Sequence, residues 1–294
     1  MTTIVPLNFV SPNTSLPIIN IAPDVTQVPS VTSGMQFYLD TTWEGATETG
    51  QFPSNSPVTA WQGAYYQKWI DAAKRLKWKA PNDSMPLAAM TTNPNSNSGW
   101  PKLSALAEDL IGGYPTMMTA SAGQVLDLNG RPTDTEYRAA QNTPTYTHFI
   151  IFKAAPGTMG GLLGQSSGTE AATVWRFGWP SASNDGQLLF QHNIANRLMI
   201  PRDVANDKPT IAIIRCNENN SGVVTIVNNG SRTDHPFAFS AGFNATENLT
   251  IGGVGTGSSG TKRRFALYSR YNRAIEAAEV DVLVQFAKDK FGAF

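Results

Sequence analysis

A chain of 294 residues is long enough to bury a full core, and it accommodates either one large domain with additions or two domains. Lys and Arg together number 22, as do Asp and Glu, and this zero net charge argues against a general nucleic-acid binder, which carries a basic excess. Hydrophobic residues make up 41% and charged residues 15%, with 25 glycines and 19 prolines. This composition excludes a helical bundle and favours a β-rich protein with many turns.

Residues 1–33 are predicted to form an extended N-terminal arm. Proline recurs there at intervals of five or six residues, which excludes a helix or a central strand. The arm is nonetheless more apolar than a disordered tail. Its candidate partner-docking residues are Ile4, Val5, Leu7, Phe9, Ile18, Ile19 and Ile21. Because such a segment has no core of its own, we expect it either to wrap over its own domain or to dock on a neighbouring subunit.

The next stretch predicts one strand and two helices. Apolar residues alternate with polar ones over residues 34–40, the period of a half-buried strand. Residues 65–79 place aromatic and basic side chains at helical spacing, which is typical of a core-facing stripe or of a helix that binds a membrane or nucleic acid; we favour the core face. Residues 101–111 predict a second helix that ends at Gly112. We treat residues 62–112, approximately, as a helical insertion.

Short strands then follow one another from residue 146 to residue 271. Their predicted ranges are 146–153, 162–163, 173–177, 187–190, 210–215, 223–227, 248–252 and 264–271. Asn228-Asn-Gly230 predicts a tight hairpin turn, and short strands at this spacing are typical of a sandwich or jelly roll. The basic run Lys262-Arg263-Arg264 is interpreted as the solvated end of a strand rather than as a basic binding patch.

One helix is predicted to close the chain. Its apolar stripe consists of Ile275, Ala278, Val282, Leu283 and Phe286. Glu276 and Glu279 stand in the first turn, Lys288 and Lys290 in the last, and this distribution of charge matches the helix dipole. Gly292 is predicted to end the helix.

The single cysteine, Cys216, excludes an intrachain disulfide. The first residues lack the basic and apolar regions of a signal peptide, and no apolar run approaches the roughly 20 residues that span a bilayer. We therefore expect a soluble chain that folds in a reducing cytoplasm and does not insert into a membrane.

The order of these segments is similar to the concanavalin A-like lectin/glucanase superfamily, in its laminin-G-like branch. Residues 265–279, continued by Lys-Phe-Gly at 290–292, resemble the closing strand, turn and helix of that family. Residues 224–230 and 249–253 resemble its Asn-Gly turn and its Leu-x-Ile-Gly-Gly motif. The resemblance covers residues 34–294. It implies a mainly β fold, a lectin-like β-sandwich jelly roll with a C-terminal helix, to which the helical insertion and the extended N-terminal arm are added.

Several positions depart from the family pattern. Ile275 stands for the usual Leu, Phe291 for Tyr, and Glu276 occupies a helix cap that is usually Ser or Thr. Leu267 stands near the place of an acidic residue in the closing strand. The fold itself hosts lectins, hydrolases, adhesins and virion proteins, so it does not by itself define a function.

Three motifs that resemble catalytic or cofactor sites lack the context that their chemistry requires. Glucanases of this superfamily carry paired acids on one strand, whereas the only Glu-x-Asp here, Glu279-Val-Asp281, lies in the predicted helix. Residues 164–168 match a nucleophile elbow and residues 255–260 a dinucleotide fingerprint, but a strand rather than a helix follows each. We therefore expect no catalytic residues, no cofactor and a protein that is not an enzyme.

The three histidines, His148, His192 and His235, lack the spacing of metal ligands. They are interpreted as single structural or surface histidines, although a cluster in space is not excluded by their separation in the sequence. We expect no metal site.

One segment has the residue types of a lectin-type site. Trp175 and Trp179 are followed by a polar loop that contains Asn184 and Asp185. An aromatic platform with Asn and Asp beside it suits the apolar face and the hydroxyls of a sugar. The alternative is a Trp175 that belongs to the core, followed by an ordinary hairpin loop.

These patterns lead to the hypothesis of a non-enzymatic structural or binding protein of a virus particle, a bacteriophage capsid decoration or a tail or fibre component. It would be assembled in the host cytoplasm and located in the virion. The arm would anchor it to other virion proteins, the chain would form a homo-oligomer, and the sandwich would face a neighbour or a host surface glycan. The alternative is a bacterial carbohydrate-binding protein or a glycan-active enzyme.

Overall fold

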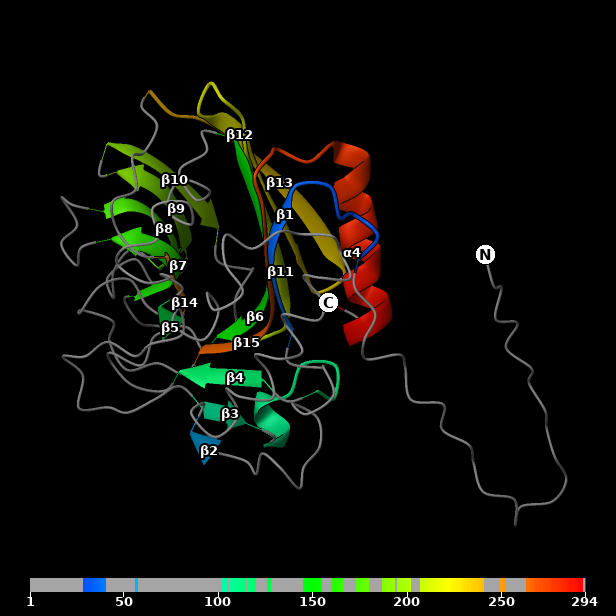
Figure 1. The fold of residues 1–294 in the computed structure, drawn as a ribbon. Helices are drawn as coiled ribbons and strands as arrows, with labels where there is room; N and C mark the ends of the chain where they lie inside the picture. The colour runs from blue at the N-terminus through cyan, green and yellow to red at the C-terminus, as the bar shows by residue number, and fades with distance from the viewer. Residues whose placement is uncertain are drawn as a thin grey trace, which may run out of the picture.

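A computed structural model of the chain shows two antiparallel sheets, with one helix beside the larger sheet (Figure 1). The residues it describes are 29–40, 56–57, 102–104, 106–114, 116–119, 126–127, 145–154, 160–166, 173–179, 187–193, 195–201, 207–240, 249–251, 263–292 and 294. The expected mainly β fold with a C-terminal helix is confirmed. In this part of the chain, no helix is long and apolar enough to cross a membrane.

The larger sheet has nine strands in the order β13-β12-β11-β6-β15-β4-β3-β2, and β1 also pairs with β15. Its strands are β1 (Met35–Asp40), β2 (Ser56–Pro57), β3 (Lys102–Ser104), β4 (Thr116–Thr119), β6 (Tyr146–Ala154), β11 (Thr210–Cys216), β12 (Ser221–Asn228), β13 (Ser231–Ala238) and β15 (Arg263–Tyr271). The strand at the chain's beginning thus pairs with the strand that precedes the closing helix, so both ends of the described fold meet at β15.

The smaller sheet has six strands in the order β10-β9-β8-β7-β14-β5. They are β5 (Leu126–Asp127), β7 (Gly160–Ser166), β8 (Thr173–Trp179), β9 (Gln187–Asn193), β10 (Asn196–Pro201) and β14 (Leu249–Ile251). Every predicted strand range falls on a strand of one of the two sheets. The sequence did not indicate β3, β4, β5, β10 or β13.

The core lies between the sheets and under the helix. On β6, Phe152 faces the smaller sheet and meets Phe177 of β8 edge to face, with ring centroids 6.1 Å apart. Thr147, at an odd-numbered position of the same strand, faces the start of the helix instead. A strand covered on both faces buries all its residues, and β15 is buried along its whole length. This explains why the central strand β11 is an apolar run without alternation, and why the polar residues of β15 are buried together with its apolar ones.

The closing helix, α4 (Ala277–Phe291), is capped as the sequence predicts. The Glu276 side chain accepts from the backbone at Glu279, the Glu279 side chain accepts from the Glu276 backbone, and Gly292 ends the helix with φ 85°. The predicted stripe was wrong at Val282 and Ala278, which are exposed. The buried helix residues are Val280, Leu283, Val284, Phe286, Ala287, Lys290 and Phe291. Their spacing of three and four residues is the one that a single helix face requires.

The second predicted helix, over residues 101–111, was wrong. Lys102–Ser104 forms β3, which pairs with β4, and only Ala107–Asp109 makes a 3₁₀ turn. Leu106, which a helix over this range would place on the same side as Leu103 and Leu110, is 37% exposed. Sheet pairing with β4 therefore overrides the local helical preference. The other predicted helix, residues 65–79, lies outside the described residues, as does the arm before Pro29.

The basic run at the start of β15 is not a solvated strand end. Arg263 and Arg264 are 1% and 3% exposed. Arg264 Nε lies 2.6 Å from the carboxylate of Asp109, which is fully buried, and its Nη1 lies 2.5 Å from Asp207. Burial lowers the pKa of Arg263 to about 10. These arginines belong to the interior because β15 is a central strand, so they cannot form a basic surface patch.

The β12–β13 hairpin confirms the predicted Asn-Gly turn, with positive φ at Asn229 (52°) and Gly230 (76°). Asn228 faces Ser231 across this two-residue turn, and hydrogen-bonded pairs alternate from there along the hairpin. Pro236, opposite Val223, therefore falls at a position whose backbone nitrogen points away from β12. Among the described strands, β13 pairs only with β12. Proline thus removes a donor from the free edge of the sheet, where it hinders the addition of another strand.

Replacing Pro236 by Val is expected to promote self-association of the chain through β13. The substitution restores an outward N–H and adds a β-branched side chain to an exposed edge. Light scattering across a concentration series measures the effect. Pro236→Lys restores the same N–H but adds a charge, and it is expected to stay at the parent's mass. Equal masses for the parent and Pro236→Val would contradict the role given to the proline.

Candidate functional site

The structure places Trp175, the first residue of the predicted ligand site, in the core. Its side chain is fully buried, and its ring stacks on that of His148 with centroids 4.4 Å apart. It therefore packs the interior and offers no platform at the surface. The side chain of Trp179 and the residues Asn184 and Asp185 lie outside the described part of the chain, so a ligand site in this loop stays a prediction.

The structure brings two of the three histidines together between the sheets. His192 of β9 and His148 of β6 both lie beside the ring of Tyr146, with centroids 6.2 Å and 5.0 Å away. The third, His235, is half-buried on β13 and contacts Thr233. The interpretation of all three as single histidines was therefore wrong for His148 and His192. Nothing in the sequence indicates this cluster, except that both residues stand in apolar strands.

The cluster is held by short polar contacts. Tyr146 Oη lies 2.6 Å from His192 Nε2, and Tyr268 Oη lies 3.0 Å from His148 Nδ1. Burial raises the pKa values of Tyr146 and Tyr268 and lowers that of His148. Burial also raises the pKa of the Cys216 thiol to about 11. These groups are neutral near pH 7, so they offer neither a thiolate nor an ionised base for nucleophilic or general base chemistry.

Acidic side chains that could act in pairs are not found in the described interior. Asp109 is the only buried carboxylate there, and it is bound to Arg264. Glu279 and Asp281 lie on α4, where Glu279 binds Arg273 and Asp281 binds Arg232. Within the described residues, no group of three or more His, Cys, Asp or Glu side chains is placed to hold a metal ion.

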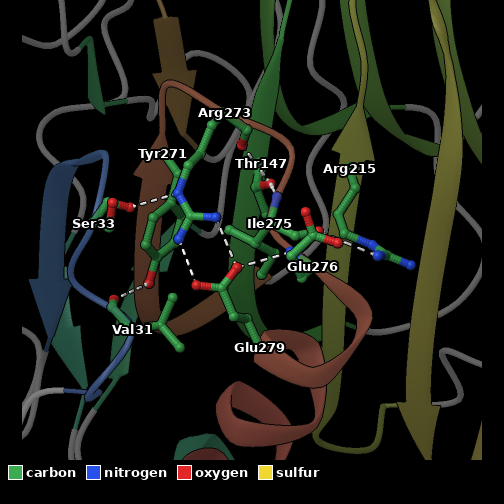
Figure 2. A network of polar contacts seen from close by, with 9 residues as sticks. All are labelled: Val31, Ser33, Thr147, Arg215, Tyr271, Arg273, Ile275, Glu276 and Glu279. Atoms are coloured by element: carbon green, nitrogen blue, oxygen red, sulfur yellow. Dashed lines mark hydrogen bonds and ion pairs between the residues drawn. The ribbon is translucent and has the colours of Figure 1, made fainter.

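A second polar network fixes the root of the N-terminal arm (Figure 2). Tyr271 Oη, buried at the end of β15, donates to the carbonyl of Val31 over 3.0 Å. Arg273 Nε donates to the carbonyl of Ser33 over 2.9 Å, and the backbone N–H of Asn272 donates to Gly34. The Val31 side chain is 6% exposed. The last residues of the predicted arm are therefore part of the folded domain.

Gly34 is required at this junction for a specific reason. Its φ is +75°, and a Cβ placed there would lie 2.6 Å from Asn272 Oδ1. Because the exposed Asn272 side chain can shift, the positive φ is the main reason that glycine is favoured here.

The same arginine joins the arm root to the start of α4. The Arg273 guanidinium binds both carboxylate oxygens of Glu279, at 2.7 and 2.5 Å, and these hydrogen bonds lower the pKa of Glu279. Glu279 also caps the helix through the backbone N–H of Glu276. Thr147 of β6 donates to the Arg273 carbonyl and accepts from the N–H of Ile275 (Figure 2). Arm root, closing strand and helix start therefore form one connected unit.

Comparisons with known proteins find only distant structural likenesses. No protein-family model matches the chain, and no curated protein matches it. The binding domain of botulinum neurotoxin DC in complex with SialylT is 14% identical (TM-score 0.40), over 58% of this chain and 42% of that one. Trypanosoma rangeli sialidase in complex with a difluoro-KDN is 13% identical (TM-score 0.45), over 61% and 28%. The binding domain of Paraclostridial Mosquitocidal Protein 1 is 13% identical (TM-score 0.43), over 66% and 50%.

This chain therefore spans half or less of the length of each of these proteins. Their fit is too loose, and their identity too low, to transfer a ligand or an activity. The architecture of two antiparallel sheets follows from the strand pairing of this chain itself, and such an architecture hosts binding domains and enzymes alike.

Proposed function

We propose that the chain is a non-catalytic binding and assembly protein of a virus particle, a bacteriophage capsid decoration or a tail or fibre component. Residues 1–33 serve as the docking arm toward other virion proteins or a second copy of the chain. The sandwich presents the loop with Trp179, Asn184 and Asp185 to a host surface glycan.

The fixed root of the arm is the observation that carries this proposal. Tyr271 and Arg273 hold the carbonyls of Val31 and Ser33, so the last residues of the arm are fixed at a defined point of the sandwich. A docking segment that starts from a rigid point loses less freedom when it binds, which favours association. The apolar residues of the arm, from Ile4 to Ile21, then supply the surface that a partner would bury.

Removing residues 1–28 is expected to abolish assembly and to leave the sandwich folded. The truncated chain keeps Val31 to Gly34 and hence the contacts of the root. Light scattering measures the mass of the full and the truncated chain, and complementation of a virus that lacks the gene measures entry into the particle. Tyr271→Phe, which removes one bond to the root and leaves the arm sequence intact, is expected to weaken both readouts less than the truncation does. Assembly that is unchanged by the truncation would contradict the docking role.

A glycan array on the full chain tests the second half of the proposal. Binding that Trp179→Ala or Asn184→Ala removes would support the loop as the glycan site. An array that is silent for the parent would remove the glycan from the proposal and leave only assembly. Glycan binding by a chain that neither assembles nor enters a particle would favour a bacterial carbohydrate-binding protein instead.

A further inference from the structure

We infer that the two sheets are joined at one end by an acid-sensitive contact, formed by His148 and His192 with the hydroxyls of Tyr146 and Tyr268. Protonation of either ring would break the contact and loosen the sheets from each other. This inference concerns the sandwich itself and does not rest on the proposed role of the arm.

The two rings lie at the boundary between the sheets. His192 belongs to β9 of the smaller sheet, and its Nε2 lies 2.6 Å from the hydroxyl of Tyr146, which belongs to β6 of the larger sheet. His148 belongs to the larger sheet and stacks on Trp175 of β8 in the smaller one. Each histidine therefore links one sheet to the other, by a hydrogen bond in one case and by ring stacking in the other.

The surroundings of His148 accommodate the neutral ring and not the cation. Its Nδ1 bonds to the hydroxyl of Tyr268, while its buried Nε2 has no hydrogen-bond partner among the described residues. A protonated imidazole carries two N–H donors, so one of them would be buried without an acceptor. Arg270, which pairs with His148 in the ladder between β6 and β15, adds a like charge.

The surroundings of His192 are equally unsuited to a charge. Its ring packs edge to face against Phe190, Phe237 and Phe239, with centroids 4.8 to 6.3 Å away. A proton on Nε2 would make this nitrogen a donor, so the Tyr146 hydroxyl could no longer donate to it.

The direction of the pH effect follows from these contacts. The titratable groups placed against the two rings are Tyr146 on β6, Tyr268 and Arg270 on β15, and Cys216 on β11. Burial, and then Arg270, lower the pKa of His148 below the usual value of about 6.5 that it regains on unfolding. The unfolded chain then binds more protons, so stability is complete above about pH 6.5 and falls as the pH drops below it.

Urea unfolding of the full chain from about pH 8 to about pH 5 tests the inference, in a range above the titration of ordinary carboxylates. The midpoint of the parent is expected to fall as the pH drops. His148→Phe keeps a ring on Trp175, and His192→Gln keeps an acceptor for Tyr146; both are expected to reduce the pH dependence. His235→Gln, at the third and half-buried histidine, is the matched control. Burial also lowers the pKa of His235, but less than that of His148, so this variant is expected to reduce the pH dependence less than either core variant does. A parent-like pH dependence in both core variants would overturn the inference.

A second measurement covers the case in which the core variants do not fold. In the parent labelled at its histidine rings, nuclear magnetic resonance is expected to show one ring, that of His235, that titrates while the chain is folded, and two that stay neutral until the chain unfolds. Three rings that all titrate while the fold stays intact would overturn the inference as well.

Discussion

Replacing Arg264 by Met is expected to lower the free energy of unfolding by about 3–5 kcal/mol, because it leaves a buried carboxylate without its cation. Asp109 is fully buried and Arg264 is 4% exposed, and the two atoms that join them lie 2.6 Å apart. Met fills much of the space of the arginine stem, so lost packing contributes little. Chemical denaturation of the parent and the variant at neutral pH measures the loss.

The second partner of the same guanidinium provides the control. Asp207 also binds Arg264, but its side chain is 40% exposed. Asp207→Asn is therefore expected to cost no more than about 1 kcal/mol, the range of solvated ion pairs. The loss in the free energy of unfolding caused by Arg264→Met should also become smaller as the pH falls toward about 4, because a buried carboxylate that has lost its arginine takes up a proton more readily than one in the unfolded chain. Equal losses in the two variants would contradict the buried pair.

Much of the sandwich could be predicted because its strands carry their own pattern. The central strand β11 is covered on both faces, and it appears in the sequence as an apolar run. The Asn229-Gly230 turn and the caps of α4 are local chemistry, set by residues next to each other in the chain. Elements of this kind need no knowledge of their distant partners.

The elements that were missed depend on distant partners. The pattern of β13 contains Pro236 and two charged residues, and only the register with β12 makes it a strand. Residues 101–111 have the spacing of a helix, yet residues 102–104 form β3. They do so because they pair with β4, which follows later along the chain. Pairing of this kind is a tertiary effect, which outweighs local preference in short segments.

The candidate site was the least predictable part for the same reason. His148 and His192 stand 44 residues apart in the sequence, and only the facing of the two sheets brings them to one tyrosine. By sequence, Arg263 and Arg264 resemble a run of surface charges. They are buried because β15 is a central strand, and the buried Asp109 binds Arg264. Trp175 fits a lectin platform by residue type, but its strand position points it inward. Residue type alone could not separate the interior from the surface at these positions.

Gly112 lies in the turn between the 3₁₀ segment and β4. Replacing it by Ala is expected to lower the free energy of unfolding by about 2–5 kcal/mol. Gly112 has φ +61°, and a Cβ there would lie 2.2 Å from the carbonyl oxygen of Phe291 in α4. Left-handed backbone costs a side chain about 1–2 kcal/mol, and overpacking against a backbone group about 1–3 more. The neighbouring Gly113 also has a positive φ, +83°, but a Cβ there meets nothing within 4 Å.

Gly113→Ala is therefore a control that carries the backbone strain without the clash, and it is expected to cost only about 1–2 kcal/mol. The difference between the two variants isolates the close approach of this turn to the end of α4, where Tyr114 also packs edge to face on Phe291. Denaturation midpoints measure both losses, and proteolysis at the end of α4 should increase for Gly112→Ala alone. Equal losses would mean that the turn and the helix end can move apart freely, in which case the backbone angle and not the helix contact makes glycine necessary at both positions.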